Sequence, residues 1–579
     1  MARVTIDPLT RIEGHLRIEM ETTGNAITKA WSEATQFRGL ETIVLGRDPR
    51  DVWAFVQRIC GVCTTVHAIA SITAVENAIG ATVPHQALLI RDMIMAAQEI
   101  QDHVIHFYHL HALDWVNAAS AASADPAKAV AFADAIGSTW KGNNLGRMTA
   151  VRDTVKNVVD SGQLSIFTGG YWDHPDYRLP PEANLMAVAH YLDALEFQRS
   201  MIRINTVFGG KNPHPNFLVG GMACSIDPSH SETVNQVQTD LIQEWVQEIY
   251  DFVRTCYVPD AMAIVGVYKD YFDIGASSPN YLAVGRAGAC FAGDPNQAPR
   301  YPSPMMDIKP GVILNDDFSK VLDFDASKIT ESIASSWFKY ADGGKSLTPD
   351  KGETTVDYTG PSLPYTWLGD SDKYSWCKAP RYDGHPMQVG PLSRVMLAYA
   401  QGHPRTKEIV DNALASLQIT PKQMNSTAGR TLARAVECLT SAETLWKDTF
   451  PTFIAGIKAG DINVFDPARW EPSSWPTSCQ GYCIVEVARG NLSHWVGIEK
   501  GKISHYQAVV PTTWLAGGRD ETGMQGPYEE SLAGNGLHPL VDPAQPLEPL
   551  RTIHSFDPCM SCSVHVLDPD GDASEVSLS

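Results

Sequence analysis

The sequence predicts a mainly α fold with small β-sheets at both chain ends, an α+β architecture around a central bundle of long helices. Three observations support this. Apolar residues recur every three or four positions in the middle of the chain, short alternating segments lie near each end, and no long Gly/Ser-rich or Pro-rich linker divides the 579 residues. We therefore expect intertwined lobes rather than separable modules.

Two segments are predicted to form the terminal sheets. Residues 4 to about 34 include stretches such as 15–20 in which polar and apolar residues alternate, as in a strand with one buried face. Residues 481–487 and 501–510 alternate in the same way near the C-terminus. Between them, residues 342–391 are rich in Gly, Pro, Asp and Tyr and predict a long irregular excursion packed by aromatic side chains.

Helices are predicted for four segments in the middle of the chain. The first is marked by an apolar stripe consisting of Ile90, Met93, Ile94, Ala97, Ile100, Val104 and Phe107. A second stripe runs over residues 234–252, and Pro259 is expected just beyond the end of that helix, because a proline cannot continue it. Segments 187–204 and 427–446 are predicted to be helical as well.

Composition and charge exclude several classes of protein. The formal net charge of −21 disfavours contact with phosphate backbones, so no nucleic-acid partner is expected. Residues 1–15 have no apolar core of signal-peptide length, and no run of about 18 apolar residues is present to span a membrane. The 11 cysteines, mostly isolated, do not indicate a disulfide framework.

Two C-x-x-C pairs lie near opposite ends of the chain. Cys60 and Cys63 stand in R-I-C-G-V-C-T-T-V-H, and Cys559 and Cys562 stand in D-P-C-M-S-C-S-V-H. Four thiolates at this spacing can bind one metal, and by themselves they fit a structural zinc site as well as an iron–sulfur site. Zinc ribbons usually bring their pairs together within a few tens of residues, so a separation of roughly five hundred favours a buried reaction centre.

Together with other segments, these motifs resemble the large subunits of nickel–iron hydrogenases. The other segments are R-I-E-G-H (11–15), F-R-G-L-E (37–41), H-F-Y (106–108), G-G-K-N-P-H (209–214), Y-S-W (374–376), V-V-P-T-T-W (509–514) and R-T-I-H (551–554). The ordered set is far more specific than a single C-x-x-C pair. The resemblance implies the nickel–iron hydrogenase large-subunit fold, with residues 1–565 as one intertwined domain.

The resemblance implies a catalytic subunit that oxidises H2 reversibly and heterolytically to protons and electrons at a nickel–iron centre. By similarity, Cys60 and Cys559 are terminal nickel ligands, while Cys63 and Cys562 bridge nickel to an iron that carries carbon monoxide and cyanide. Soft thiolates suit these metals. An ordinary cysteine at position 559 separates the chain from the selenocysteine variant.

Splitting H2 also needs a nearby base. The resemblance offers two, the Cys559 thiolate and Arg489, and the ordinary alternative for the arginine is a buried ion pair. Relatives commonly have a proline before this arginine, where this sequence has Ala488. Because of this difference, the exact shape of the implied pocket around Arg489 and the metal does not follow from the resemblance.

Three acidic residues complete the implied catalytic set. Glu13 matches a glutamate that carries protons away from the cysteine, although a glutamate in a charged strand is usually solvated. Asp102 and Asp557 match carboxylates that orient the arginine, and helix or turn capping is the alternative for both.

Three further residues are implied neighbours of the cofactor. His67, four residues beyond Cys63, would donate a hydrogen bond to a bridging thiolate, and a merely packed histidine is the alternative. Pro511 and Thr512, in the V-V-P-T-T-W segment, are expected to bind the cofactor through the same resemblance.

A second metal site is implied near the C-terminus. Glu41 and His565 resemble ligands of a hard cation, magnesium, with a backbone carbonyl near Ala508 as a further ligand.

The remaining histidines and cysteines are predicted to be structural. No carboxylate or cysteine completes a plausible metal site around the clustered histidines, which are His103, His106, His109 and His111. Buried thiols without metal are expected for Cys224, Cys256, Cys290, Cys377, Cys438, Cys479 and Cys483.

Residues 566–579 form a short acidic tail whose ordinary interpretation is a frayed terminus. The resemblance implies instead that maturation proteins insert the metals and a C-terminal endopeptidase then cuts after His565, so that the sequence is a precursor. A regulatory hydrogen sensor with the same metal site is the alternative function, and such relatives generally lack the tail. A respiratory-complex scaffold of related fold would have lost the four cysteines.

The electrons must leave through another protein. The other cysteines include no C-x-x-C run able to hold an iron–sulfur relay, so no iron–sulfur cluster is expected in this chain. The resemblance implies a heterodimer with an iron–sulfur small subunit, or a dimer of such heterodimers, and indirectly a membrane cytochrome b or another electron acceptor. The small subunit would export both chains from the cytoplasm, where the precursor is made, to the periplasmic side of the cytoplasmic membrane.

Overall fold

The computed structural model describes residues 2–163, 174–286, 288–292, 307–534 and 538–563. His565 and the tail 566–579 lie outside the described residues, and for Cys562 only the backbone is described. Within these ranges, no helix combines the length and the apolar character needed to cross a membrane.

The N-terminal sheet has three antiparallel strands in the order β1 (Ala2–Ile6), β2 (Leu16–Thr23) and β3 (Ala26–Ala34). The register pairs Val4 with Met20 and Met20 with Ala30. These apolar side chains lie on one face of the sheet, as the alternating pattern requires, and enter a core shared with the C-terminal region. The strand prediction for this segment is confirmed.

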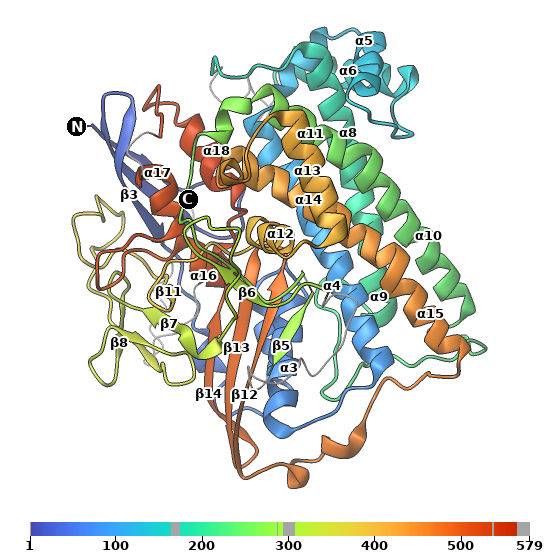
Figure 1. Cartoon of the computed structure of the whole chain (residues 1–579), viewed down its shortest axis with the longest axis vertical. Helices are drawn as coiled ribbons and strands as arrows, with labels where there is room; N and C mark the ends of the chain where they lie inside the picture. Colours follow the sequence, from blue (N-terminus) through green and yellow to red (C-terminus); the bar gives the residue numbers. More distant parts are fainter. Residues whose placement is uncertain (1, 164–173, 287, 293–306, 535–537, 564–579) are drawn as a thin grey trace.

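Long helices occupy the middle of the chain and lie side by side in Figure 1. The principal ones are α3 (Val66–Ile79), α4 (His85–Ile105), α8 (Pro181–Met201), α9 (Arg203–Gly209), α10 (Gln236–Phe252), α11 (Val258–Val267), α14 (Thr427–Thr444) and α15 (Phe450–Lys458). The four predicted helical segments are therefore confirmed. α14 begins after Ser426, whose side chain caps it by accepting a hydrogen bond from the Gly429 N–H.

The expected helix end before Pro259 is wrong. α10 passes into a π-helical turn at Val253–Tyr257, and α11 follows directly with Pro259 in its first turn. A proline within a helix cannot donate a hydrogen bond to the preceding turn, and the wider π-helical turn lies immediately before this position. The period of the apolar stripe did not reveal this wider turn. A second π-helical turn, Leu445–Thr449, joins α14 to α15.

A second sheet, in the order β14-β13-β12-β5, stands against α3. Its strands are β12 (Ser478–Val487), β13 (Gly490–Glu499), β14 (Lys502–Val509) and the short β5 (Cys290–Ala292). The prediction of strands near the C-terminus is confirmed.

The segment 342–391 is more regular than predicted. Short strand pairs join β10 (Thr354–Val356) to β8 (Phe338–Tyr340), and β11 (Ala379–Tyr382) to β7 (Ile329–Ser332), which also pairs with β9 (Ser346–Leu347). Aromatic rings pack there as expected, with the Trp337 and Trp376 ring centroids 5.2 Å apart. Strands of three or four residues are too short to show a period in the sequence.

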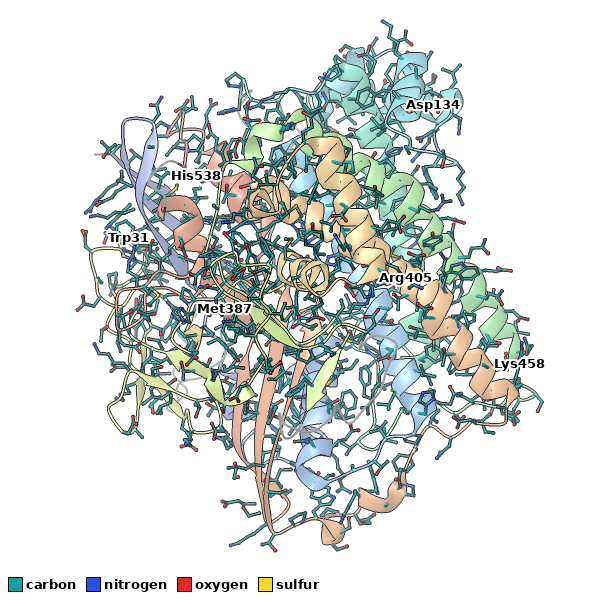
Figure 2. The ribbon with its side chains drawn as sticks, viewed as in Figure 1. Trp31, Asp134, Met387, Arg405, Lys458 and His538 are labelled. Carbon is teal, nitrogen blue, oxygen red and sulfur yellow. The ribbon has the colours of Figure 1, made fainter. Side chains whose placement is uncertain are left out.

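The other elements connect these layers. They are α1 (Leu40–Ile43), α2 (Val52–Val56), α5 (Pro126–Ala135), α6 (Leu145–Asp160), β4 (Tyr281–Ala283), β6 (Gly311–Ile313), α12 (Pro391–Ala400), α13 (Pro404–Leu417), α16 (Pro511–Ala516), α17 (Pro527–Ala533), α18 (Leu547–Ser555) and α19 (Met560–Ser563). Figure 2 shows side chains filling the space between helices and sheet, with buried Met387 inside and Asp134 and Lys458 at the edge.

The two ends of the chain meet in the interior. Glu13 forms an isolated parallel bridge with Cys559, in which the Glu13 N–H donates to the Pro558 carbonyl at 3.4 Å and the Met560 N–H donates to the Glu13 carbonyl at 2.7 Å. Gly14 follows with a φ of +79°, and a Cβ there would lie 2.5 Å from the Ser561 nitrogen. Only glycine fits this close approach of the two backbones.

The close packing of β12 against α3 can be tested by substitution. A Cβ on Gly481 would lie 2.4 Å from the Ala78 nitrogen and 2.5 Å from the Ala74 oxygen, and both are backbone atoms. We expect Gly481→Ala to destabilise the protein by ~1–3 kcal/mol, because the strand must move off the helix. Thermal unfolding would show a lower midpoint.

Gly266→Ala is the matched control, because the nearest atom to a Cβ there is a Leu417 methyl at 3.8 Å. Its midpoint should stay the same or rise, since alanine favours the helix. Equal midpoints for the two variants would contradict the packing argument.

Candidate metal centre

Three thiols from both ends of the chain converge at one buried point. The sulfur atoms of Cys60, Cys63 and Cys559 all lie within 4.8 Å of one another, and Cys60 and Cys559 are 3.4 Å apart. Cys60 follows a 3-10 turn, Gln57–Ile59, and its sulfur accepts the Cys63 N–H at 3.2 Å. This local turn makes both thiols of the first pair face the same way.

The second pair is placed by the chain ends and by α16. Besides the bridge to Glu13, the Cys559 N–H donates to Thr512 Oγ1 at 3.1 Å. Pro511 begins α16 and Thr512 is its second residue, so the predicted cofactor-binding segment lies against the Cys559 backbone. Cys562 stands on α19, one helical turn after Cys559.

The donor set fits a soft metal. Among the described side chains, the ligands that converge here are sulfur atoms, which suit nickel, iron or zinc rather than magnesium or calcium. The cysteines are 0–5% exposed, so a metal held by them would be shielded from bulk water. The structure therefore brings together three of the four predicted ligands.

Glu13 lies beside this thiol group. Its Oε2 is 3.3 Å from Cys559 Sγ and accepts the Ser561 N–H at 3.0 Å. Burial, and next the nearby Cys60 charge, raise the pKa of Glu13 above its usual value. The solvated alternative does not hold for this glutamate, because its carboxyl group faces the cysteines.

Arg489 spans two carboxylates in the same buried region. Its Nη1 is 3.1 Å from Asp102 Oδ2 and its Nη2 is 3.2 Å from Asp557 Oδ1. Burial alone would lower the pKa of Arg489, but Asp557, Asp102 and the cysteine thiolates raise it well above its usual value. The guanidinium therefore stays protonated, and we refer to Arg489, Asp102 and Asp557 as the arginine bridge.

The two carboxylates are held differently. Asp102 lies on α4, where its Oδ1 accepts a hydrogen bond from Gln98 Nε2 at 2.9 Å. Burial raises the pKa of Asp102 to about 7, although Arg489 opposes this shift. Asp557 adopts a left-handed φ of 62° just before Pro558, and its N–H donates to the His554 carbonyl at 2.9 Å. Asp102 lies inside α4 and caps no helix, whereas the Asp557 backbone closes the C-terminal turn of α18, so the capping alternative holds for Asp557.

His67 lies in the first turn of α3, four residues after Cys63, and begins a chain of polar contacts. Its Nδ1 is 3.0 Å from His494 Nε2, and His494 Nδ1 is 2.5 Å from the Tyr506 hydroxyl. Burial lowers the pKa of His494 to about 3, so this imidazole is neutral. One atom of each contacting pair must donate, so these contacts couple the tautomers of the two histidines.

Comparison with known proteins agrees with this geometry. Residues 38–565 match the sequence profile of the family described as nickel-dependent hydrogenase, and residues 3–33 match a profile described as HoxL-like. The chain is 45% identical over 583 residues to the uptake hydrogenase large subunit of Rhizobium leguminosarum bv. viciae, covering 98% of this chain and 96% of that one.

The chain belongs to the nickel-dependent hydrogenase family. It is also 42% identical to the hydrogenase-1 large chain of Escherichia coli K12, again over 98% of this chain and 96% of that one. Among solved structures, the Ni-Fe-Se hydrogenase from D. vulgaris Hildenborough superposes with a TM-score of 0.74 at 30% identity, covering 97% of this chain and 100% of that one. The predicted family and large-subunit resemblance are confirmed.

The hydrogenase chain also brings together part of the predicted magnesium site. Glu41 is buried, and its Oε1 accepts the Ala508 N–H at 2.8 Å. Burial raises the pKa of Glu41 to about 7, while Lys378 opposes the shift. The contact with Ala508 runs through its N–H rather than its carbonyl, and the third predicted ligand, His565, lies outside the described residues.

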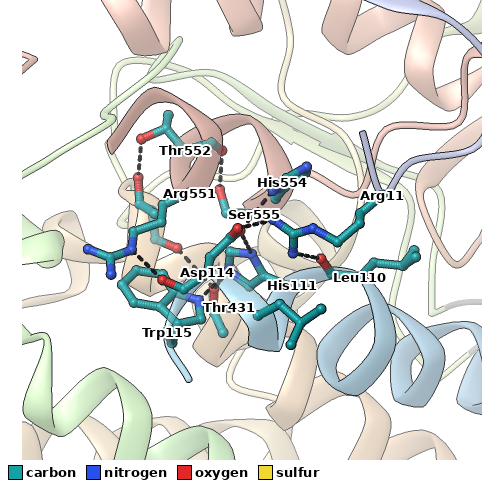
Figure 3. A network of polar contacts seen from close by, with 12 residues as sticks. Arg11, Leu110, His111, Asp114, Trp115, Thr431, Arg551, Thr552, His554 and Ser555 are labelled. Carbon is teal, nitrogen blue, oxygen red and sulfur yellow. Dashed lines mark hydrogen bonds and ion pairs between the residues drawn. The ribbon is translucent and has the colours of Figure 1, made fainter. Parts of the chain in front are cut away.

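The prediction that no carboxylate or cysteine accompanies the clustered histidines is wrong for this hydrogenase. His103 lies between Glu99 and Glu437, and His111 lies with Asp114 and His554 (Figure 3). Glu99 and Asp114 lie within four residues of their histidines, so these two neighbours could be read from the spacing. Glu437 on α14 and His554 on α18 are far away in sequence, and spacing could not reveal them. A further group, also unforeseen, joins Cys256 to His190 and Asp260.

Hydrogen bonds account for these groups without a metal. His554 and His111 contact Asp114 at 2.8 and 3.1 Å, and Arg11 pairs with the same carboxylate (Figure 3). His554 Nε2 also donates to the Thr10 carbonyl at 2.8 Å. This cluster therefore ties the segment before Glu13 to the helix before Cys559.

Sequence reasoning missed several residues that support the site. They are Gln98, His494 and Tyr506, together with Asp114 and His554. His554 is part of the R-T-I-H segment, which was the one available signal for it. Gln98 and Asp114 lie within four residues of a partner, whereas His494 meets His67 only through tertiary packing.

The cluster in Figure 3 predicts a pH-dependent stability. Burial lowers the pKa of His111 from 6.5 to about 4, although Asp114 opposes this, so the unfolded chain binds more protons between those values. The contribution of His111 to stability is thus full above about pH 6.5 and declines as the pH falls to about 4. Thermal midpoints from pH 8 to 4 should fall more steeply in the wild type than in His111→Asn.

Thr431→Val is the control, because it removes only the hydroxyl group that faces His111 Nε2 at 3.2 Å. Its pH dependence should run parallel to that of the wild type. Parallel curves for wild type and His111→Asn would show that His111 does not titrate in this window.

Proposed function

We propose that this chain is the catalytic large subunit of a nickel–iron hydrogenase that oxidises H2 reversibly and heterolytically to protons and electrons. The observation that carries the proposal is the convergence of buried thiols from both chain ends next to Glu13 and Arg489. Cys60 and Cys559 would hold nickel, while Cys63 and Cys562 would bridge it to an iron carrying carbon monoxide and cyanide. When bound, this centre would supply the redox chemistry and polarise H2.

Cys559 and Glu13 are placed to move the proton. Cys559 Sγ lies 3.3 Å from Glu13 Oε2, which is within reach for direct transfer between them. The raised pKa of Glu13 lets its carboxyl group hold a proton closer to neutral pH than a solvated glutamate would. Glu13 would then release the proton toward the protein surface.

Arg489 would act as a fixed positive charge rather than as the base. Its pKa is raised because it pairs with Asp102 and Asp557 in a buried setting, so it keeps its proton. Of the two candidate bases, the geometry thus favours the Cys559 thiolate. The arginine would orient H2 beside the metal and stabilise negative charge on the cysteines.

The rest of the assembly is proposed from the family. Residues 1–565 would form one intertwined domain, and maturation proteins and an endopeptidase would insert the metals and remove residues 566–579. Glu41, the Ala508 carbonyl and His565 would hold magnesium. Electrons would pass to an iron–sulfur small subunit, in a heterodimer or a dimer of heterodimers, and then to a membrane cytochrome b or another acceptor on the periplasmic side.

Hydrogen-dependent dye reduction by the anaerobically purified complex tests the proposed reaction. Cys559→Ala should lose essentially all activity, because it removes a proposed nickel ligand and the proposed base together. Metal analysis should show less nickel in the variant. A wild-type complex that is inactive although its mass shows cleavage after His565 would contradict the enzyme and favour a hydrogen sensor.

Glu13→Gln tests the proton path separately from metal binding. The amide cannot carry the proton onward, so the turnover number should fall by about 10²–10⁴-fold while nickel content stays the same. Glu196→Gln is the control, since that side chain is 73% exposed and pairs with Arg199 at the surface. Full activity in Glu13→Gln would mean that protons leave by another route.

A further inference from the structure

One face of α14 is lined by buried polar side chains. Arg430, Arg434, Glu437 and Ser441 follow one another at spacings of four, three and four, and each is at most 4% exposed. Residues at these spacings share one face of a helix. Their polar groups bond to other elements, and those elements carry the arginine bridge of Arg489, Asp102 and Asp557.

The N-terminal half of this face holds the segment before Asp557. Arg434 Nη1 donates to the Ser555 carbonyl at 3.0 Å, and Arg430 Nε donates to the Ser555 hydroxyl at 2.8 Å. The Arg430 guanidinium also stacks 3.8 Å from the centroid of the Phe556 ring. α18 therefore ends in a defined place two residues before Asp557.

Glu437 reaches Arg489 through Arg394. Its two carboxylate oxygens accept Arg394 Nε at 2.5 Å and Nη2 at 2.7 Å. Arg394 donates in turn to the Val487 carbonyl at 2.8 Å and to the Ala488 carbonyl at 3.1 Å. The backbone is thus fixed immediately before Arg489.

Glu437 also reaches Asp102 through the neighbouring residue. Glu437 Oε2 lies 3.1 Å from His103 Nε2, and His103 follows Asp102 on α4. One carboxylate therefore contacts the partners that hold both the arginine and one of its two acidic neighbours. Its own charge is matched by the Arg394 guanidinium, as a buried carboxylate requires.

We propose that Glu437 is a positioning residue that holds the Arg489–Asp102 ion pair in place above the cysteines. It contacts neither residue of that pair directly and acts through Arg394 and His103. The catalytic consequence rests on the proposed hydrogenase function, whereas the geometric consequence does not. A residue that fixes two partners at once is suited to this role, because displacement of either one by about 1 Å can slow a reaction by 10²-fold.

The variant Glu437→Gln tests the proposal with little change in shape. The amide cannot accept both Arg394 hydrogen bonds, so the backbone at 487–488 should shift. A crystal structure of the assembled complex should show the Arg489 Nη1 to Asp102 Oδ2 distance, 3.1 Å here, lengthened beyond hydrogen-bonding range. Hydrogen oxidation should fall about 10- to 100-fold in kcat/KM, with nickel content unchanged.

Two comparisons separate positioning from a general loss of stability. Glu443→Gln, on the same helix but paired with Lys447 at the surface, should leave the ion pair and the activity as in the wild type. In an Arg489→Lys background, Glu437→Gln should add less than about a 2-fold loss, because residues that act through one another are not additive. Full additivity of the two losses would overturn the proposal.

Arg394→Lys provides a second route in case Glu437→Gln fails to fold. Lysine keeps the charge but cannot donate simultaneously to Glu437 and to both carbonyls, so it should displace Arg489 in the same way. An intact ion pair in the crystal structure of either variant overturns the proposal whatever its activity. If the wild type proved not to oxidise hydrogen, the crystallographic distances would still decide the geometric claim.

Discussion

The pairing of the two chain ends at Glu13 and Cys559 is the constraint on which the rest of the structure depends. It joins groups 546 positions apart in the sequence through a few backbone hydrogen bonds and one carboxyl–thiol contact. Such contacts are too few to offset the entropy of closing so long a loop. The thiols can meet only because the helices and sheets between the two ends form a packed core that delivers both ends to one place.

That core contains more charge than stability alone favours. Arg489 and Arg394 are buried with their carboxylate partners, and ion pairs in an interior rarely stabilise a fold more than apolar side chains of the same volume would. These ion pairs do fix the orientation of the arginine side chains, because a guanidinium that is held at several nitrogens can point in only one direction. Buried charge concentrated beside the thiols is therefore consistent with a centre that needs fixed geometry.

Much of the fold could be predicted from the sequence, because long helices and alternating strands leave a period that one chain shows. The π-helical turn before Pro259 left no such period in the sequence. For the site, motif resemblance was enough to predict that Cys60, Cys559, Glu13 and Arg489 belong together. Their supports, such as Glu437 and His494, are polar residues in otherwise ordinary elements, and their partners lie hundreds of positions away. Only the tertiary structure could reveal those contacts.

The cysteines and the arginine bridge also depend on each other electrostatically. The thiolates help to raise the pKa of Arg489, and by the same interaction the guanidinium favours the ionised thiols that a soft metal requires. This mutual effect needs the cation to stay close, yet the residue before it is Ala488, without the rigid ring of a proline. Arg394 donates to the Ala488 carbonyl at 3.1 Å, so a hydrogen bond from the core restricts the backbone immediately before Arg489.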